Sequence, residues 1–291
     1  MMRVLDNLFL DANRFIDQRG SDRDEDLRQV RLVIKRSRSY LRLLRPVMGE
    51  TTYFRENRKL RSSGRRLSML RDTHVAQATL QQWSRRVTRP SERRALQAVM
   101  ESLARQLTQA HPMGAGRDNA MKRVGAELLL LRGRLPDWTL NQTGWEALRP
   151  GLKNTFRRAR RCMRVALKTN HDDDYHDWRR HTKDLFFHLQ LLAGAWPESL
   201  RTFGQRLHEL QKRIGQDHDI GLVVNLLKED PVFRADPELR RVCKKLASQS
   251  GKLREAIESE GRKLFDRSPG KFTKRLEKHW VEWVGDTAQE R

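Results

Sequence analysis

Apolar residues recur at helical spacing along nearly all of this 291-residue chain, and almost no stretch alternates between apolar and polar residues as a strand does. This periodicity predicts an all-α protein. Prolines and glycines separate the periodic segments. We expect helices over residues 2–18, 23–45, 53–70, 73–88, 91–109, 117–132, 145–169, 174–193, 198–214, 219–229, 236–265 and 271–284.

These segments are strongly basic. The chain has 60 Lys+Arg against 37 Asp+Glu, a formal net charge of +23. The excess is spread over both halves of the sequence, so it is not a basic tail. Because such a charge repels itself in a folded protein, an anionic partner would relieve it. A polyanion is therefore the first hypothesis for what the chain binds.

The segment 23–45 shows how the cations are arranged. At about 100° per residue, its basic residues occupy roughly a quarter of the helix circumference, next to an apolar stripe. No acid occurs between Leu27 and Pro46, although solvated helix faces normally mix charge signs to gain pairs at i,i+4. The basic stripe consists of Arg28, Arg31, Lys35, Arg38 and Arg42, and the apolar stripe of Val30, Ile34, Leu41 and Leu44.

Similar groups of cations occur on other predicted helices. Arginine offers a planar fork to phosphate oxygens and lysine a compact charge, so several such faces suit an extended phosphate polymer. The further candidate binding residues are Arg65 and Arg66, then Arg157, Arg160, Arg161 and Arg164, then His176, Arg179, Arg180 and Lys183, and finally Lys212 and Arg213.

A weak internal repeat links the two halves of the chain. The segment from Leu27 to Leu44 aligns without a gap on the segment from Tyr175 to Leu192, so that Arg31 matches Arg179 and Lys35 matches Lys183. The repeat predicts two related helical halves, residues 1–136 and 145–291.

These repeats resemble a known family. The stretch YHDWRRHTKDLFFHLQLL, preceded by GLKNTFRRARRCMRVA and followed by LQKRIGQDHDIGLV, resembles the CHAD domain, the conserved-histidine α-helical domain. The stretch LRQVRLVIKRSRSYLRLLRP is similar to its other repeat. The resemblance implies one domain over residues 1–291, a helical bundle of two pseudo-symmetric halves around a basic central cavity or groove. It also implies non-catalytic binding of inorganic polyphosphate, and a location on polyphosphate granules.

The motif of the family falls on His176, Arg179 and Lys183 in the second half of this chain. In the first half the place of the histidine is taken by Arg28, which keeps a cation but loses a titrating imidazole. Phe186 stands where the first half has Arg38, so we expect the second group of cations to be shorter and to bind less tightly at that end.

Two other function classes compete with this interpretation. A metal-dependent phosphohydrolase of the HD type is also all-α, and His-Asp pairs begin at His171, His176 and His218. However, His176 shares its face with cations, so we expect no metal site and no cofactor. Nucleic acid is a secondary possibility, because single-strand binding needs exposed aromatic residues and Trp83, Trp178, Trp196 and Trp280 lie in apolar patterns.

The acidic residues and the cysteines predict structural roles. We expect Asp172, Asp173 and Asp174 to form the acidic start of a helix, and Asp72 and Asp219 to cap the next helix or to pair with an arginine.

The chain has two cysteines, and one of them lies on an arginine-rich segment. Cys162 is either a thiol of lowered pKa or, as we expect, a small buried residue. The two cysteines and the short apolar runs favour a soluble, cytoplasmic protein without a membrane span; they leave the oligomeric state open.

Overall fold

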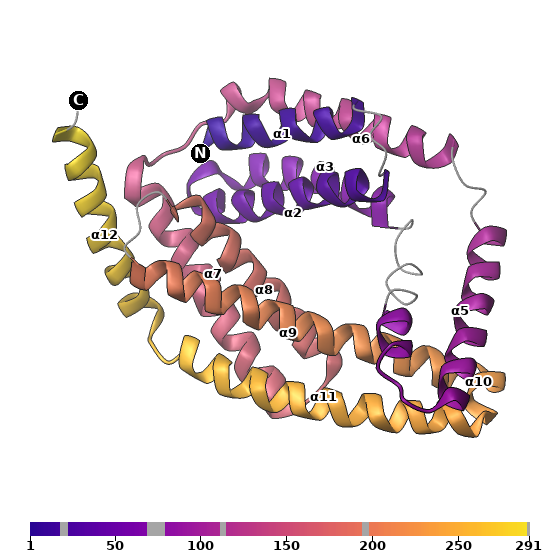
Figure 1. Ribbon diagram of the computed structural model, residues 1–291. Coiled ribbons are helices and arrows are strands. Elements are labelled where there is room, and N and C mark those ends of the chain that lie inside the picture. Colours follow the sequence, from indigo (N-terminus) through magenta and orange to yellow (C-terminus); the bar gives the residue numbers. More distant parts are fainter. Residues whose placement is uncertain (18–22, 69–78, 111–114, 194–197, 290–291) are drawn as a thin grey trace.

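The computed structural model describes residues 1–17, 23–68, 79–110, 115–193 and 198–289 (Figure 1). Within these ranges every regular element is a helix, which confirms the predicted all-α fold. Of the predicted helix 73–88, residues 79–84 are helical, whereas residues 73–78 lie outside the described ranges. Asp72 and Trp196 also lie outside them.

A four-helix group forms at the N-terminal side of the molecule. Within it α1 packs on α2, α2 on α3, α3 on α6 and α6 on α1. Figure 1 shows α1 and α6 lying side by side over α2 and α3. Its members are α1 (Met2–Asp17), α2 (Arg23–Met48), α3 (Glu50–Ser68) and α6 (Ala115–Gly133).

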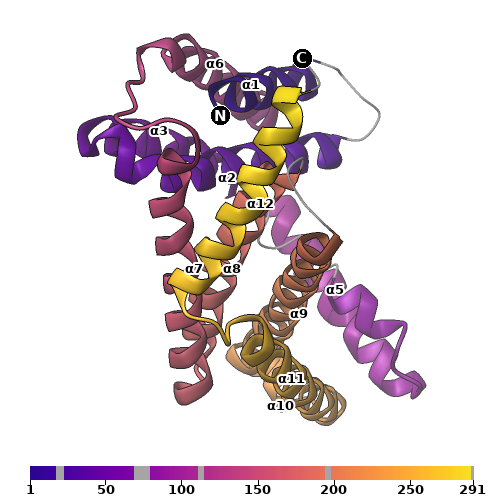
Figure 2. The same cartoon turned by 90° about the vertical axis from the view of Figure 1, so that its left-hand side faces the viewer.

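The remaining chain builds a second set of helices. In it α7 packs on α8 and α12, and α9 packs on α8 and α11, so that the long helices α9 and α11 run alongside each other (Figures 1 and 2). Its long members are α7 (Gly144–Thr169), α8 (Asp172–Leu191), α9 (Glu198–Glu229), α11 (Pro237–Leu264) and α12 (Pro269–Gln289). Two short elements, η1 (Leu135–Asp137) and α10 (Pro231–Ala235), lie between the longer helices.

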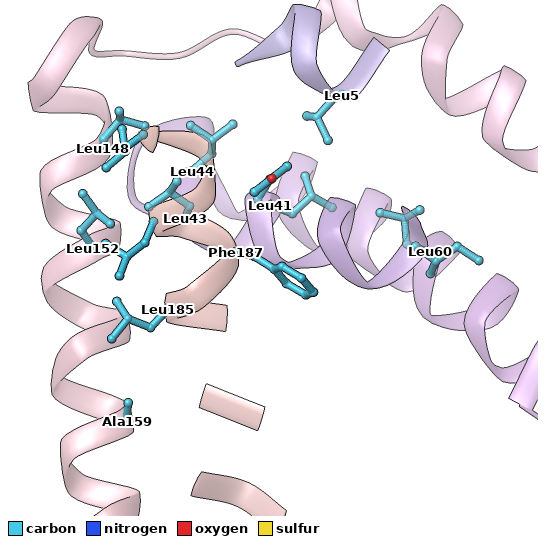
Figure 3. Packing of buried hydrophobic residues seen from close by; sticks show 14 of the residues in the cluster. Leu5, Leu41, Leu43, Leu44, Leu60, Leu148, Leu152, Ala159, Leu185 and Phe187 are labelled. Atoms are coloured by element: carbon cyan, nitrogen blue, oxygen red, sulfur yellow. The ribbon is translucent and has the colours of Figure 1, made fainter. Parts of the chain in front are cut away.

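The two sets meet where α2 crosses α7 and α8. Leu43 and Leu44 of α2 are fully buried there, facing Leu148 and Leu152 of α7 and Leu185 of α8 (Figure 3). The stripe predicted for α2 is confirmed, because Val30, Ile34, Leu41 and Leu44 are all buried. Trp178 of α8 is also in the core, as predicted, whereas Trp83 and Trp280 are half-buried. Burial of this apolar stripe is what fixes the orientation of the basic face beside it.

Helix α5 (Pro90–Ala110) packs far from the other helices of its half of the sequence. It contacts α11, and its residues Leu96 and Val99 join a second hydrophobic cluster with Val223 of α9 and Val242 of α11. Figure 1 shows α5 beside α11, away from α1 to α3. The two predicted halves of the sequence are therefore interleaved at this end of the molecule.

The segment predicted as two helices, 198–214 and 219–229, is the single helix α9. That prediction was wrong because it took the residues from Gly215 to Asp219 as a turn. Gly215 and Asp217 are buried, and Asp217 accepts hydrogen bonds from Arg254 (3.0 Å) and Ser250 of α11. These tertiary contacts outweigh the low helix propensity of glycine and aspartate. Asp219 therefore lies inside a helix and does not cap one.

The three consecutive aspartates occupy the first turn of α8, as predicted. There they favour the positive end of the helix dipole. Their side chains do not cap this helix, because the N-cap is His171, which makes no capping hydrogen bond. Instead Asp172 pairs with Arg254 of α11, and Asp174 accepts a hydrogen bond from Thr169 at 2.6 Å. The acids thus connect the start of α8 to its neighbours.

Candidate anion-binding site

A groove lies between α2, α8 and α9, with a cavity volume of ≈ 620 Å³. We call it the α2–α8–α9 groove. Five cations from the three helices line it, and none of the described residues that line it is acidic. Such a lining favours an anion, because a negative charge placed in the groove lies close to several positive charges. The cations are Arg28 and Arg36 of α2, Lys183 of α8, and Arg201 and Lys212 of α9.

Arg36 of α2 and Lys183 of α8 both line the groove and both approach the ring of Phe187. The guanidinium carbon Cζ of Arg36 is 5.7 Å from the ring centroid, and Nζ of Lys183 is 5.5 Å from it. Arg36 also donates a long hydrogen bond from Nη2 to Oε1 of Gln190, at 3.4 Å. Its buried Nε has no hydrogen-bond partner among the described residues. Its contacts with Phe187 and Gln190 thus hold the Arg36 side chain at the groove.

Two other groove cations hold weak ion pairs within their own helices. Arg28 pairs with Glu25 at 2.5 Å and Lys212 with Glu209 at 2.9 Å, each three residues away along the helix and solvent-exposed. Exposed pairs of this kind contribute about 0–1 kcal/mol. A phosphate group could replace either carboxylate at little cost in free energy.

A second basic concavity lies on the other side of α8, between α7 and α8, with a volume of ≈ 510 Å³. We call it the α7–α8 hollow. Arg180 pairs there with Asp177 at 3.2 Å. Burial lowers the pKa of His181 to about 4 despite the opposing effect of Asp184, so this imidazole is neutral at pH 7. Its lining consists of Asn154, Arg157, Arg158, Arg161, Cys162, Asp177, Arg180 and His181.

The two remaining motif residues of α8 face α9. An ideal Cβ on Gly215 would lie 2.7 Å from Nη2 and 3.0 Å from Cζ of Arg179, so the glycine makes room for that guanidinium. The rings of His176 and His218 are 5.1 Å apart between centroids. Burial, His218 and Arg179 lower the pKa of His176. At pH 7 His176 therefore adds less positive charge than its place in the motif suggests.

Five of the predicted binding residues make internal contacts that hold helices together. Their guanidinium groups already have acceptors within the protein, so they are the less available ones for a ligand. Arg31 donates to the carbonyl of Leu67 (2.6 Å), Arg38 to Asn57 (3.2 Å), Arg42 to Asp184 (2.5 Å), Arg66 to Glu127, and Arg160 to the carbonyls of Phe265 (2.9 Å) and Asp266 (3.3 Å).

The rest of the predicted set is distributed over the surface. Of the candidates, Arg28, Lys183 and Lys212 meet in the α2–α8–α9 groove, and Arg157, Arg161 and Arg180 meet in the α7–α8 hollow. Lys35, Arg65, Arg164 and Arg213 are exposed and line neither.

Sequence reasoning missed Arg36 and Arg201. Arg36 lies outside the basic stripe of its helix, about 80° from Arg28 on a helical wheel. The small residues Ser37 and Ser39 beside it, both buried, are a signal that another helix crosses closely there.

No group of three or more His, Cys, Asp or Glu side chains within the described ranges is placed to hold a metal ion. Burial raises the pKa of Cys162, which contradicts the alternative of an activated thiol. None of the described helices combines the length and the apolar character needed to cross a membrane.

Comparison with known proteins agrees with the resemblance noted in the sequence. The family model of the CHAD domain matches residues 10–228, about three quarters of the chain. The chain belongs to the CHAD domain family. The CHAD match runs from α1 to the last turn of α9, so both concavities lie within it, and α10, α11 and α12 follow it. No curated protein matches this CHAD domain chain.

Proposed function

We propose that this protein binds inorganic polyphosphate in the α2–α8–α9 groove and does not turn it over. The observation that carries the proposal is the lining of that groove, to which three helices contribute five cations and none of the described residues contributes an acidic side chain. A linear phosphate polymer presents many charged oxygens in a row and contacts cations on several helices at once. Membership of the CHAD family supports the same ligand.

The α7–α8 hollow would extend the binding surface. A long polymer that leaves the groove can reach further arginines on the other side of α8, where Arg157, Arg161 and Arg180 lie. Each neutralised phosphate releases a counterion, so affinity should fall steeply as salt increases. The extended surface implies that long chains bind more tightly than short ones.

Replacing both Arg36 and Lys183 with alanine tests the groove. Charge-assisted hydrogen bonds contribute about 1.5–3 kcal/mol each, so we expect binding of long-chain polyphosphate to weaken by at least tenfold. The slope of log affinity against log salt should become shallower by roughly 1.4, as two lost phosphate contacts predict. Titration calorimetry at several salt concentrations measures both quantities, and circular dichroism checks that helicity is unchanged.

The matched control removes two exposed cations elsewhere. Arg240 and Lys244 lie on α11, outside the CHAD match and outside both concavities. Their double replacement with alanine changes the net charge by the same amount and should leave affinity nearly unchanged. Equal losses in the two double variants would mean that net charge alone attracts polyphosphate, and would contradict a site in the groove.

A second test asks whether the surface that binds polyphosphate extends to Arg179, a motif cation that lines neither the groove nor the hollow. Gly215→Ala places a methyl group 2.7 Å from Nη2 of Arg179, too close for the guanidinium to keep its position. Because the end of an arginine side chain can move, the fold should persist while polyphosphate affinity falls by about tenfold, equivalent to one charge-assisted hydrogen bond. Gly221→Ala on the same helix is the control, since its Cβ would meet only Asp172 at an ordinary 3.4 Å. Unchanged affinity in Gly215→Ala would remove Arg179 from the site.

A further inference from the structure

The lining of the α2–α8–α9 groove is partly apolar, which a purely inorganic phosphate polymer does not require. Leu32 of α2 and Phe186, Phe187, Leu189 and Ala193 at α8 line the groove alongside the cations. Phosphate oxygens held against carbon lose hydration without gaining hydrogen bonds. Phe186 occupies the position that aligns with Arg38 of the first repeat, so an aromatic ring stands here in place of a cation.

Phe186 forms an aromatic surface together with a histidine of α9. Its ring stacks on that of His208, with centroids 4.6 Å apart and an interplanar angle of 24°. Burial, together with Lys212 and Lys183, lowers the pKa of His208, so the imidazole is uncharged at pH 7. It therefore presents a flat neutral ring close to two lysines. Flat rings near cations suit a ligand that joins an aromatic base to phosphates.

The polar groups beside this stack also fit such a ligand. Three glutamines, Gln190, Gln205 and Gln211, line the groove, and Nε2 of Gln211 lies 3.1 Å from Nδ1 of His208. An amide both donates and accepts hydrogen bonds. Ionised phosphate oxygens only accept them, whereas the edge of a nucleobase offers donors and acceptors together. The groove thus combines cations, an aromatic surface and amides around one cavity.

We propose that the α2–α8–α9 groove binds nucleoside polyphosphates, with the phosphate chain on its cations and the base beside the Phe186–His208 stack. The proposal rests on the proposed function, since it assigns the phosphates to the same cations and adds a place for the base. The cavity volume of ≈ 620 Å³ lies within the range of roughly 300–1,000 Å³ that is typical of small-molecule sites.

Calorimetry in magnesium-free buffer tests the proposal by comparing the binding of ATP with that of inorganic tripolyphosphate. The two ligands carry the same number of phosphates, so a difference in affinity reports on the nucleoside. Stacking of one base contributes about 1–3 kcal/mol, so ATP should bind about tenfold more tightly than tripolyphosphate. Phe186→Ala should remove most of this advantage and leave tripolyphosphate binding unchanged. Equal affinities of the two ligands, or an ATP advantage that survives Phe186→Ala, would overturn the proposal.

A second variant keeps the test informative if Phe186→Ala folds poorly. Phe186→Arg restores the cation found at the matching position of the first repeat, so it should abolish the preference for ATP and raise the affinity for inorganic polyphosphate. Long-chain polyphosphate is measured in parallel. If it binds the wild-type chain while ATP binds no better than tripolyphosphate, only the nucleotide proposal fails; if it does not bind either, the proposed function itself fails.

Discussion

Gly151→Ala is expected to lower the free energy of unfolding by about 3 kcal/mol or more, the upper end of what overpacking costs. Gly151 is buried on α7 at the crossing with α2. A Cβ there would overlap the carbonyl oxygen of Leu43 and lie 2.7 Å from its carbonyl carbon and 2.9 Å from its Cα. These are backbone atoms, so no side chain can move aside, and the two helices must separate. Thermal unfolding followed by circular dichroism should show a melting temperature lower by roughly 5–10 °C.

Gly251→Ala is the matched control. Gly251 is exposed on α11, and nothing lies within 4 Å of the position that its Cβ would take. Alanine exceeds glycine in helix propensity by about 1 kcal/mol, so this variant should be slightly more stable than the wild type. A Gly151→Ala protein as stable as Gly251→Ala would show that α2 and α7 do not approach as closely as their described packing requires.

The fold was largely predictable from the sequence because the apolar stripes of its helices are regular. The segment predicted over 23–45 is α2, Arg23–Met48, and its four predicted core positions are buried. The prediction failed at α9, where low local propensity around Gly215 suggested a turn. Contacts from α8 and α11 to this segment keep it helical, and such contacts between distant residues cannot be recognised from local propensity.

The site was predictable only as a set of residue types on helix faces. A helical wheel places Arg31 and Lys35 on one stripe, yet it cannot show that Arg31 donates to the carbonyl of Leu67 on another helix. The same holds for Arg160, whose acceptors lie on residues 265 and 266, more than a hundred positions away in the sequence. Conversely, Arg36 reaches the groove only because α8 crosses α2 beside it. Which cations remain available to a ligand therefore depends on the tertiary structure.

Asp184→Leu is expected to destabilise the protein by about 3–5 kcal/mol, because it leaves the cation of Arg42 without its carboxylate at the crossing of α2 and α8. Oδ1 of Asp184 lies 2.5 Å from Nη2 of Arg42, and the two side chains are only 6% and 23% exposed. His188, whose Nε2 donates to the carbonyl of Ser39 at 2.8 Å, faces the same carboxylate. Burial lowers its pKa to about 4, so at pH 7 Arg42 is the charged partner of Asp184.

A double variant distinguishes loss of the charge pair from loss of packing. Arg42→Met combined with Asp184→Leu removes both charges and should regain most of the stability lost in Asp184→Leu, since an apolar pair can replace a buried ion pair. Urea unfolding of the two single variants and the double variant gives the coupling energy of the pair. If the two single losses in stability simply add in the double variant, a specific pair is contradicted.

The same double variant decides the role of Arg42. If Arg42 serves mainly to hold α2 on α8, the protein that carries both Arg42→Met and Asp184→Leu should bind polyphosphate nearly as well as the wild type. A large loss of affinity in a stable double variant would instead place Arg42 among the residues that contact the ligand.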